Sequence, residues 1–260
     1  MKTFTLQNDA LSLTFDLETG ALVGVSAVTT DWAILGRAHL GLSFRLLVPL
    51  RESGDFNAAG RRNNLVHGEK QKLTSLTVAE DGRAATMAWD DVTSEHGGTL
   101  PITVKLVVTL SADQAVFALT VENRSRYVIE SVYCPYFGDV RHPDDEEWFE
   151  GFSYHYGSAK PWPMWPSYQS LRGYWGVDHP TQFATANQSS GAPMAPYILL
   201  RGAKQGLYVG ANTPSTEIVA WHTELRPGYG SSIDSLVGDE LTNGGREVSM
   251  RFAAVHVPFI

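Results

Sequence analysis

Apolar and polar residues alternate with a period of two in one segment of this chain after another. Residues 11–17 read Leu-Ser-Leu-Thr-Phe-Asp-Leu, and residues 102–110 read Ile-Thr-Val-Lys-Leu-Val-Val-Thr-Leu. In an extended strand, successive side chains point to opposite faces, so this pattern predicts half-buried β-strands. No segment carries the 3.6-residue apolar period of an amphipathic helix over three turns, so we expect very little helix.

Turn residues between these segments predict antiparallel hairpins. Glu18-Thr19-Gly20 separates residues 11–17 from 21–25, and Gly20 can adopt the positive φ that such a turn uses. A second turn, at residues 111–114, precedes a strand-like run at 116–121. Further strands are predicted at residues 42–48, 197–200, 206–210 and 247–255. We therefore predict an all-β, antiparallel fold of two packed sheets, formed by residues 1–260 as a single domain.

Composition narrows the range of functions. The net charge of −8 disfavours nucleic acid as a partner, because binding phosphates requires clustered Lys and Arg. The single cysteine, Cys134, allows no intrachain disulfide or multi-cysteine metal site, and we expect it to be a buried, inert thiol. The first residues lack the apolar run of a signal peptide, and no window is apolar enough to span a membrane, so a cytoplasmic location is the default expectation. We predict no cofactor and no metal ion.

Aromatic residues are concentrated in residues 148–183, which hold 11 of them within 36 positions. Four prolines in this segment predict a long irregular loop rather than a regular strand ladder. Flat aromatic rings can cover the C–H face of a pyranose, while polar side chains reach its hydroxyls. The segment therefore predicts carbohydrate as the ligand, and the carbohydrate-binding candidates are Trp162, Trp165, Trp175, Tyr154, Tyr156 and Arg172.

A family resemblance points in the same direction. Residues 11–22 resemble the first hairpin of galactose-mutarotase-like β-supersandwich domains, and residues 121–125, 129–138 and 206–212 resemble later pieces of that family in order. The resemblance covers residues 4–258 and implies a two-sheet supersandwich. Such domains stand before the catalytic barrel in many glycoside hydrolases, and residues 255–260 resemble the start of a linker to a barrel. The resemblance thus favours a non-catalytic, N-terminal or accessory domain that binds or borders a sugar cleft, with a downstream catalytic domain or a second copy of the chain as partner.

Two alternatives stay open. One is a stand-alone aldose 1-epimerase-like or other small-sugar enzyme that uses a His/Glu acid–base pair. Residues 59–68 resemble the epimerase segment that contains Arg, Asn and Leu-His-Gly, although Val66 separates Leu65 from His67. The convergence of a histidine and a carboxylate would favour this enzyme; the catalytic candidates are His67, His155, Glu217 and Glu224. The other alternative is a structural domain that buries its aromatic segment against another subunit.

The densest acidic run, Asp144-Asp145-Glu146-Glu147, has two interpretations. Four carboxylates could contribute to the six to eight oxygens that Ca²⁺ prefers, but their spacing differs from that of an EF-hand loop. We therefore expect a solvated acidic turn rather than a calcium site.

Overall fold

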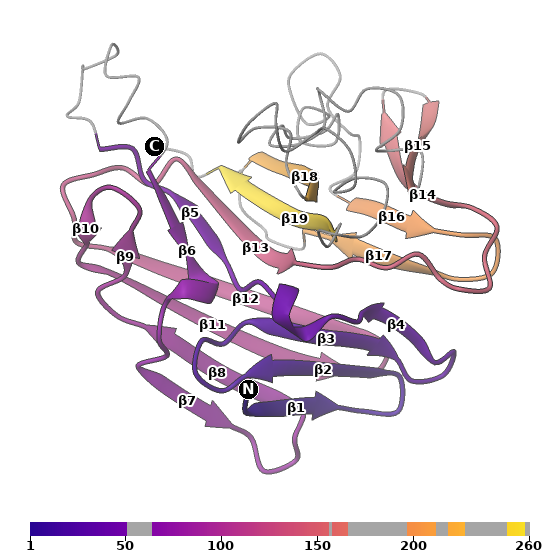
Figure 1. Cartoon of the computed structure of the whole chain (residues 1–260), viewed down its shortest axis with the longest axis horizontal. Helices are drawn as coiled ribbons and strands as arrows, with labels where there is room; N and C mark the ends of the chain where they lie inside the picture. Colours follow the sequence, from indigo (N-terminus) through magenta and orange to yellow (C-terminus); the bar gives the residue numbers. More distant parts are fainter. Residues whose placement is uncertain (51–63, 156–157, 166–196, 212–217, 227–248, 258–260) are drawn as a thin grey trace, which may run out of the picture. The chain divides into compact units, whose positions relative to one another are not determined.

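The computed structural model describes residues 1–50, 64–155, 158–165, 197–211, 218–226 and 249–257 (Figure 1). The chain divides into two compact units, Met1–Phe137 with His256–Pro258, and Gly138–Val255. Within the described residues, two short 3₁₀ helices are the only helical elements, so the prediction of an all-β fold with very little helix is confirmed. None of the described helices is long and apolar enough to cross a membrane.

The first unit contains thirteen strands and the two 3₁₀ helices among its described residues. Their bounds are β1 (Thr3–Gln7), β2 (Leu11–Asp16), β3 (Leu22–Ala27), β4 (Trp32–Leu35), η1 (Ala38–Leu40), β5 (Arg45–Leu47), β6 (Leu65–His67), η3 (Gly68–Lys70), β7 (Ser75–Val78), β8 (Ala84–Trp89), β9 (Thr93–Ser94), β10 (Gly98–Thr99), β11 (Ile102–Ser111), β12 (Gln114–Asn123) and β13 (Ser131–Phe137).

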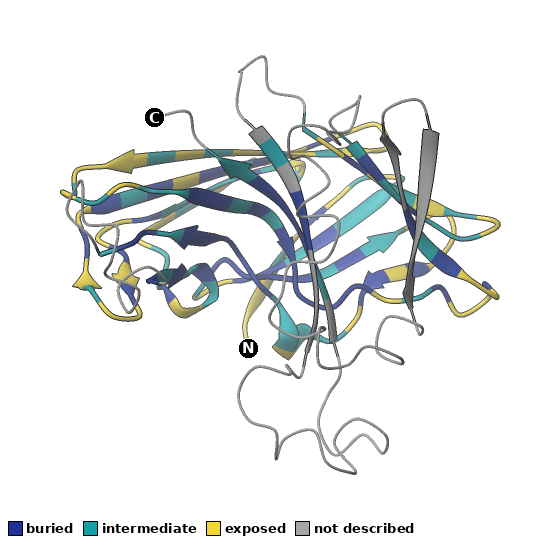
Figure 2. Cartoon of the chain, turned by 90° about the horizontal axis from the view of Figure 1, so that it is seen from above, coloured by how far each residue is buried: buried dark blue, intermediate teal, exposed yellow. Residues whose placement is uncertain are grey.

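Two four-stranded sheets form the sandwich of this unit. One has the order β1-β2-β3-β4 and the other β12-β11-β8-β7. Along β11, every second residue from Ile102 to Leu110 is buried, as the alternation predicted. Figure 2 shows buried and less buried residues alternating along the strands. Burial of each large apolar side chain contributes about 1.5–3 kcal/mol, so this inward face supplies much of the stability of the unit.

The turn between β2 and β3 is held by an aspartate and a glycine. Asp16 Oδ1 accepts hydrogen bonds from the backbone N–H groups of Glu18 and Thr19, at 2.9 and 2.8 Å. Gly20 has a φ of +69°, and a Cβ at this position would lie 2.5 Å from Cζ2 of Trp89. Glycine is therefore required here both for its backbone conformation and for the close approach of the tryptophan.

Leu17 departs from the predicted alternation. The pairing of β2 with β3 shifts register between Thr14 and Phe15, and β2 ends at Asp16. Leu17 consequently lies outside the strand and is 40% exposed. The alternation holds through Leu13 and Phe15, which are both buried, and stops where β2 ends. The sequence pattern alone does not show where a strand ends, so it placed Leu17 on the buried face.

Five further strands belong to the first unit, namely β5, β6, β9, β10 and β13, and β9 pairs with β10. β5 pairs antiparallel with both β13 and β6. Cys134 lies in β13 and is buried, and burial raises the pKa of its thiol to about 12. A thiol with this pKa is protonated throughout the physiological range and is a poor nucleophile, which confirms the prediction of a buried, inert cysteine.

The second unit contains a four-stranded antiparallel sheet of order β15-β14-β16-β17. The described strands that lie in this unit or begin there are β14 (Phe149–His155), β15 (Ser158–Trp165), β16 (Tyr197–Arg201), β17 (Gly206–Gly210), β18 (Ile218–Arg226) and β19 (Ser249–Val257). The predicted strands at 197–200 and 206–210 are confirmed as β16 and β17.

The prediction of an irregular loop is wrong for residues 149–155 and 158–165. β14 and β15 form a hairpin in which Phe152 pairs with Pro161 and Glu150 with Pro163. Proline lacks the N–H that an inner strand must donate on both sides, but an edge strand needs partners on one side only. β15 is at the edge of its sheet, so it accommodates both prolines.

The Gly20 turn gives a direct test of this packing. We expect Gly20→Ala to lower the free energy of unfolding by about 2–4 kcal/mol, from the left-handed backbone plus the overlap with Trp89. Gly82→Ala is the matched control, because Gly82 has a φ of +66° but open space around its Cβ position. The control is expected to cost only about 1 kcal/mol. Urea denaturation of both variants measures the difference, and equal losses would contradict the proposed role of Trp89.

Candidate functional site

A row of three chemically versatile residues crosses β13, β5 and β6. Tyr133 pairs with Arg45, and Arg45 pairs with His67. Residues directly opposite each other on antiparallel strands share one face of the sheet, with neighbouring Cβ atoms about 5 Å apart. The row therefore places a phenol, a guanidinium and an imidazole side by side on one face.

Arg45 is the most buried charged residue of this row, with an exposed fraction of 7%. The Cζ atom of Arg45 lies 5.4 Å from the ring centroid of Tyr133 and 4.8 Å from that of Tyr136. The electron-rich ring faces stabilise the positive charge, and guanidinium suits such stacking because it is planar and weakly hydrated. These contacts fix the position of a cation beside His67.

His67 lies between two carboxylates. Its Nε2 atom is 2.8 Å from Oε1 of Glu95, and its Nδ1 atom is 3.5 Å from Oε1 of Glu69. The first distance is that of a hydrogen bond, while the second is longer than a hydrogen bond normally is. The His67 side chain is 13% exposed, so the imidazole is largely enclosed yet reachable. We call Arg45, His67, Glu69, Glu95 and Tyr133 the His67 site.

A buried amide side chain fixes the backbone around His67. Gln71 Nε2 donates hydrogen bonds to the carbonyl oxygens of His67 and Thr93, at 2.9 and 3.0 Å. Gln71 Oε1 accepts one from the backbone N–H of Thr93 at 2.8 Å. Because Thr93 begins the strand that leads to Glu95, Gln71 sets the separation between the imidazole and its carboxylate partner.

A second buried amide, that of Asn64, holds the other side of the same turn. Asn64 Oδ1 accepts a hydrogen bond from the backbone N–H of His96 at 2.9 Å, and Asn64 Nδ2 donates to the carbonyl of Val48 at 2.9 Å. The backbone N–H of Glu95 also donates to the carbonyl of Leu65 at 2.9 Å. The turn that carries the carboxylate partner of His67 is thus held by several hydrogen bonds.

Gly68 brings the backbone after His67 close to an aromatic ring. A Cβ at Gly68 would lie 2.6 Å from Cδ1 of Phe44, and the Gly68 N–H donates to the carbonyl of Phe44 at 2.8 Å. Phe44 in turn packs edge-on against Trp89, with ring centroids 5.0 Å apart. The position of His67 is therefore coupled directly to the buried core of the first unit.

This arrangement is suited to proton transfer and to binding hydroxyl groups. A carboxylate that accepts a hydrogen bond from Nε2–H leaves Nδ1 as the acceptor of a neutral imidazole. An imidazole oriented in this way can take a proton from a hydroxyl and later return it. The carboxylates of Glu69 and Glu95 can also accept hydrogen bonds from hydroxyl groups directly.

The predicted catalytic residues have different outcomes. His67 does meet a carboxylate, but its partner is Glu95 rather than either glutamate named from the sequence. Glu224 is placed on β18 and His155 at the end of β14, and the structure describes neither side chain. Glu217 lies outside the described residues. The catalytic roles of all four residues stay predictions.

The predicted carbohydrate-binding residues are described only in part. Tyr154 lies on β14, and Trp162 and Trp165 lie on β15, while their side chains are outside the description. Tyr156, Arg172 and Trp175 lie outside the described residues altogether, and the six roles stay predictions.

Sequence reasoning missed Arg45, Glu69, Glu95 and Tyr133. Glu69 lies two positions from His67 and could have been found by its proximity. Glu95 follows His67 by 28 positions. No local sequence pattern indicates that β6 and the turn after β9 are neighbours. Arg45 sits within an apolar run, where an isolated charged residue was an available but unused signal.

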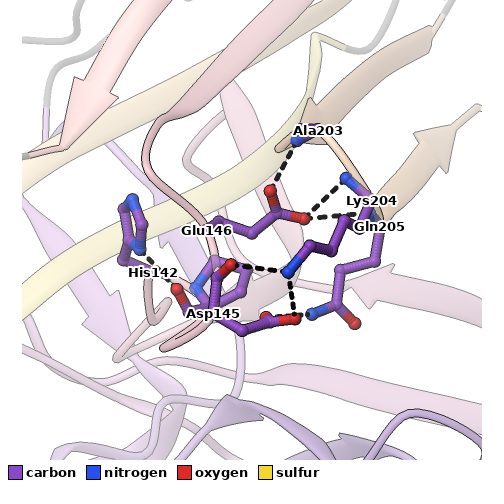
Figure 3. Close-up of polar contacts among 7 residues, drawn as sticks. His142, Asp145, Glu146, Ala203, Lys204 and Gln205 are labelled. Atoms are coloured by element: carbon purple, nitrogen blue, oxygen red, sulfur yellow. Dashed lines mark hydrogen bonds and ion pairs between the residues drawn. The ribbon is translucent and has the colours of Figure 1, made fainter.

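The acidic run at residues 144–147 forms a structural contact, and the expectation of a wholly solvated turn is wrong for Glu146. Glu146 is buried, and its carboxylate accepts backbone N–H hydrogen bonds from Ala203, Lys204 and Gln205 at 2.7, 2.7 and 3.1 Å (Figure 3). These three consecutive N–H groups belong to the turn between β16 and β17. Backbone N–H groups oriented together form a favourable site for an anion, which explains the burial of this carboxylate.

Asp145 reinforces this connection from the surface. A hydrogen bond from the Lys204 ammonium at 3.1 Å, aided by its charge, holds the pKa of the Asp145 carboxyl below its usual range. The contribution of this pair is present at neutral pH and is lost as pH falls through the lowered pKa. The part of the chain that the structure describes contains no group of three or more His, Cys, Asp or Glu residues placed to hold a metal ion.

Among the comparisons with known proteins, only the one with solved structures found matches. No protein-family model and no curated protein matches the chain. A galactose mutarotase related enzyme from Lactobacillus acidophilus is 10% identical with a TM-score of 0.46, and the match covers 97% of this chain and 85% of that one. A proposed aldose 1-epimerase from Escherichia coli K12 is 15% identical with a TM-score of 0.41, covering 98% and 87%. A galactose mutarotase-like protein from Lactobacillus casei is 8% identical with a TM-score of 0.39, covering 98% and 87%.

The geometry of the His67 site depends on Gln71. We expect Gln71→Leu to lower the free energy of unfolding by about 2–3 kcal/mol, because the N–H of Thr93 and two carbonyl oxygens lose the buried amide that is their partner. Histidine NMR should also show an altered tautomer or environment for His67. Gln114→Leu, at an exposed position, is the control and should change neither quantity. An unchanged His67 signal in Gln71→Leu would show that Gln71 does not position the site.

The buried carboxylate of Glu146 gives a second test. We expect Glu146→Gln to lower the free energy of unfolding by about 2 kcal/mol, since the amide replaces a charged acceptor with a weaker one and adds an unneeded donor. Amide hydrogen exchange at residues 203–205 should accelerate. Asp144→Asn removes the same charge from an exposed neighbour and should leave this exchange unchanged. Equal exchange in both variants would contradict the assigned hydrogen bonds.

Proposed function

We propose that this chain acts on a small sugar at the His67 site, as an aldose 1-epimerase-like enzyme in which His67 transfers the proton. The observation that carries the proposal is the 2.8 Å contact between His67 Nε2 and Glu95 Oε1, with Nδ1 directed to a more distant carboxylate. A contact between His67 and a carboxylate supports the enzyme, although the carboxylate is Glu95 and not Glu217 or Glu224. The placement before a catalytic barrel, suggested by the resemblance, is untested.

The chemistry requires few groups. Glu95 holds the proton on Nε2, so Nδ1 of His67 can accept the proton of the anomeric hydroxyl. As the C1–O1 bond gains carbonyl character, the bond between C1 and the ring oxygen breaks, and the ring oxygen takes a proton from water. Rotation about the C1–C2 bond and reversal of these steps give the other anomer, with His67 returning its proton.

The remaining groups of the site would bind the sugar. Glu69, 3.5 Å from the imidazole, is placed to accept a hydrogen bond from a hydroxyl next to the reacting carbon. Tyr133 offers a ring face to the C–H groups of a pyranose and a hydroxyl to its rim. The guanidinium of Arg45, held near this ring, adds a positive charge that favours developing negative charge on oxygen.

Polarimetry of freshly dissolved α-D-glucose and α-D-galactose tests the activity. The wild-type protein is expected to accelerate the approach to anomeric equilibrium, and His67→Gln to reduce that acceleration by about 10²-fold or more, the usual range for a general acid–base group. His96→Gln alters an exposed histidine beside Glu95 and is the matched control.

Two results would contradict the proposal. A wild-type protein that leaves the rate at its buffer value for every aldose tested would exclude the epimerase activity. A His67→Gln variant as active as the wild type would remove His67 from the chemistry.

A sugar-binding accessory domain is the second candidate. The observation that favours it is the place of β15, which carries Trp162 and Trp165, at the edge of its sheet. Sugar binding without mutarotation, lost in Trp162→Ala or Trp165→Ala, would favour this candidate over the enzyme.

A further inference from the structure

We propose that the second unit carries a separate binding surface for neutral oligosaccharides, on the face of the β14-β16-β17 sheet that bears Tyr197 and Tyr208. We call Trp148, Glu150, Tyr197, Arg201 and Tyr208 the tyrosine platform. It shares no residue with the His67 site, so a test of one proposal does not decide the other.

The strand register places the members of the platform on one face. Tyr197 pairs with Gly210, Leu199 with Tyr208, and Arg201 with both Gly206 and Glu150. The alternate positions Ile198, Leu200 and Val209 are buried. Because alternate residues of a strand point to opposite faces, the platform residues of these strands occupy the face turned away from the core.

The two tyrosines form a flat aromatic surface. Their ring centroids are 5.2 Å apart with an interplanar angle of 29°. Tyr208 is 64% exposed, an unusual exposure for a residue that normally buries its ring. A Cβ at Gly210 would lie 2.6 Å from Oη of Tyr208, so glycine at this position allows the phenol to lie against the strand.

Polar groups border the platform and are balanced in charge. Arg201 donates hydrogen bonds from Nε and Nη2 to Oε1 of Glu150, at 3.1 and 2.9 Å, and its Cζ atom lies 5.9 Å from the ring of Trp148. Lys204, at the adjoining turn, is paired with Asp145. Among the described residues, both cations at the platform, Arg201 and Lys204, are paired with a carboxylate, so this surface suits an uncharged ligand.

A pyranose chain matches these features. Its C–H faces can stack on exposed aromatic rings, while its hydroxyls can exchange hydrogen bonds with the half-exposed Arg201–Glu150 pair. Trp148, which is 41% exposed, would extend the aromatic surface for a further sugar unit. We therefore infer an oligosaccharide or polysaccharide as the ligand rather than a single aldose.

Affinity electrophoresis provides the test. The wild-type chain is run through gels that contain soluble neutral glucan, galactan, mannan or xylan, and retardation relative to a polymer-free gel gives the association constant. We expect retardation by at least one polymer, a loss of about tenfold in association constant for Tyr208→Ala, and near-complete retention in Tyr208→Phe, which keeps the ring.

Controls separate this surface from the His67 site. Tyr127→Ala removes a tyrosine of the first unit, whose ring lies under Arg126, and should retain wild-type retardation. His67→Gln should also retain it, whatever the outcome of the mutarotation assay. Since Tyr208 is exposed, its replacement is not expected to disturb folding, which circular dichroism would verify.

Three outcomes would overturn the proposal. The first is a wild-type chain that no neutral polymer retards. The second is Tyr208→Ala with wild-type retardation. The third is a concentration-dependent dimer that Tyr208→Ala abolishes in the absence of polymer retardation, which would identify the platform as a contact between copies of the chain.

Discussion

The packing around Trp89 is the constraint on which the first unit depends. This side chain is fully buried, donates a hydrogen bond from Nε1 to the carbonyl of Thr19 at 2.9 Å, and meets Phe44 edge-on. On one side it therefore requires glycine at position 20, and on the other it supports the ring against which Gly68 rests. Because Gly68 directly follows His67, the same tryptophan that closes the sandwich also determines where the imidazole of the proposed active site lies.

The polar part of the His67 site is positioned by neutral amides. Gln71 and Asn64 are both buried, and each binds backbone groups of the turn that carries Glu95. Buried polar groups are stabilising only when their hydrogen bonds are made, so a network of this kind favours a single geometry. In the second unit, Glu146 fixes the turn between β16 and β17 in a comparable way, but with a charge, and so orders the strands that carry the tyrosine platform.

Local patterns predicted the fold well where a strand is long and uninterrupted. The period-two alternation of β11 and the turn at Gly20 both appear in the structure as predicted. Prediction failed where context overrode a local rule. Leu17 is exposed because β2 ends at Asp16, and Pro161 and Pro163 lie in a strand because that strand is at an edge. Neither the end of a strand nor its edge position in the sheet can be read from the local composition.

The sequence by itself determined the all-β class, the hairpins and the buried thiol, because these follow from alternation, turn residues and hydrophobicity within a few neighbouring positions. It also named His67 as one of four catalytic candidates. Only the tertiary structure decided that the partner of His67 is Glu95, that Arg45 lies near the rings of two tyrosines, and that Glu146 is buried rather than solvated. These contacts join residues between 28 and 91 positions apart in the first unit and nearly 60 apart in the second. Pairings over such distances depend on how strands are ordered in the sheets, which no short stretch of sequence encodes.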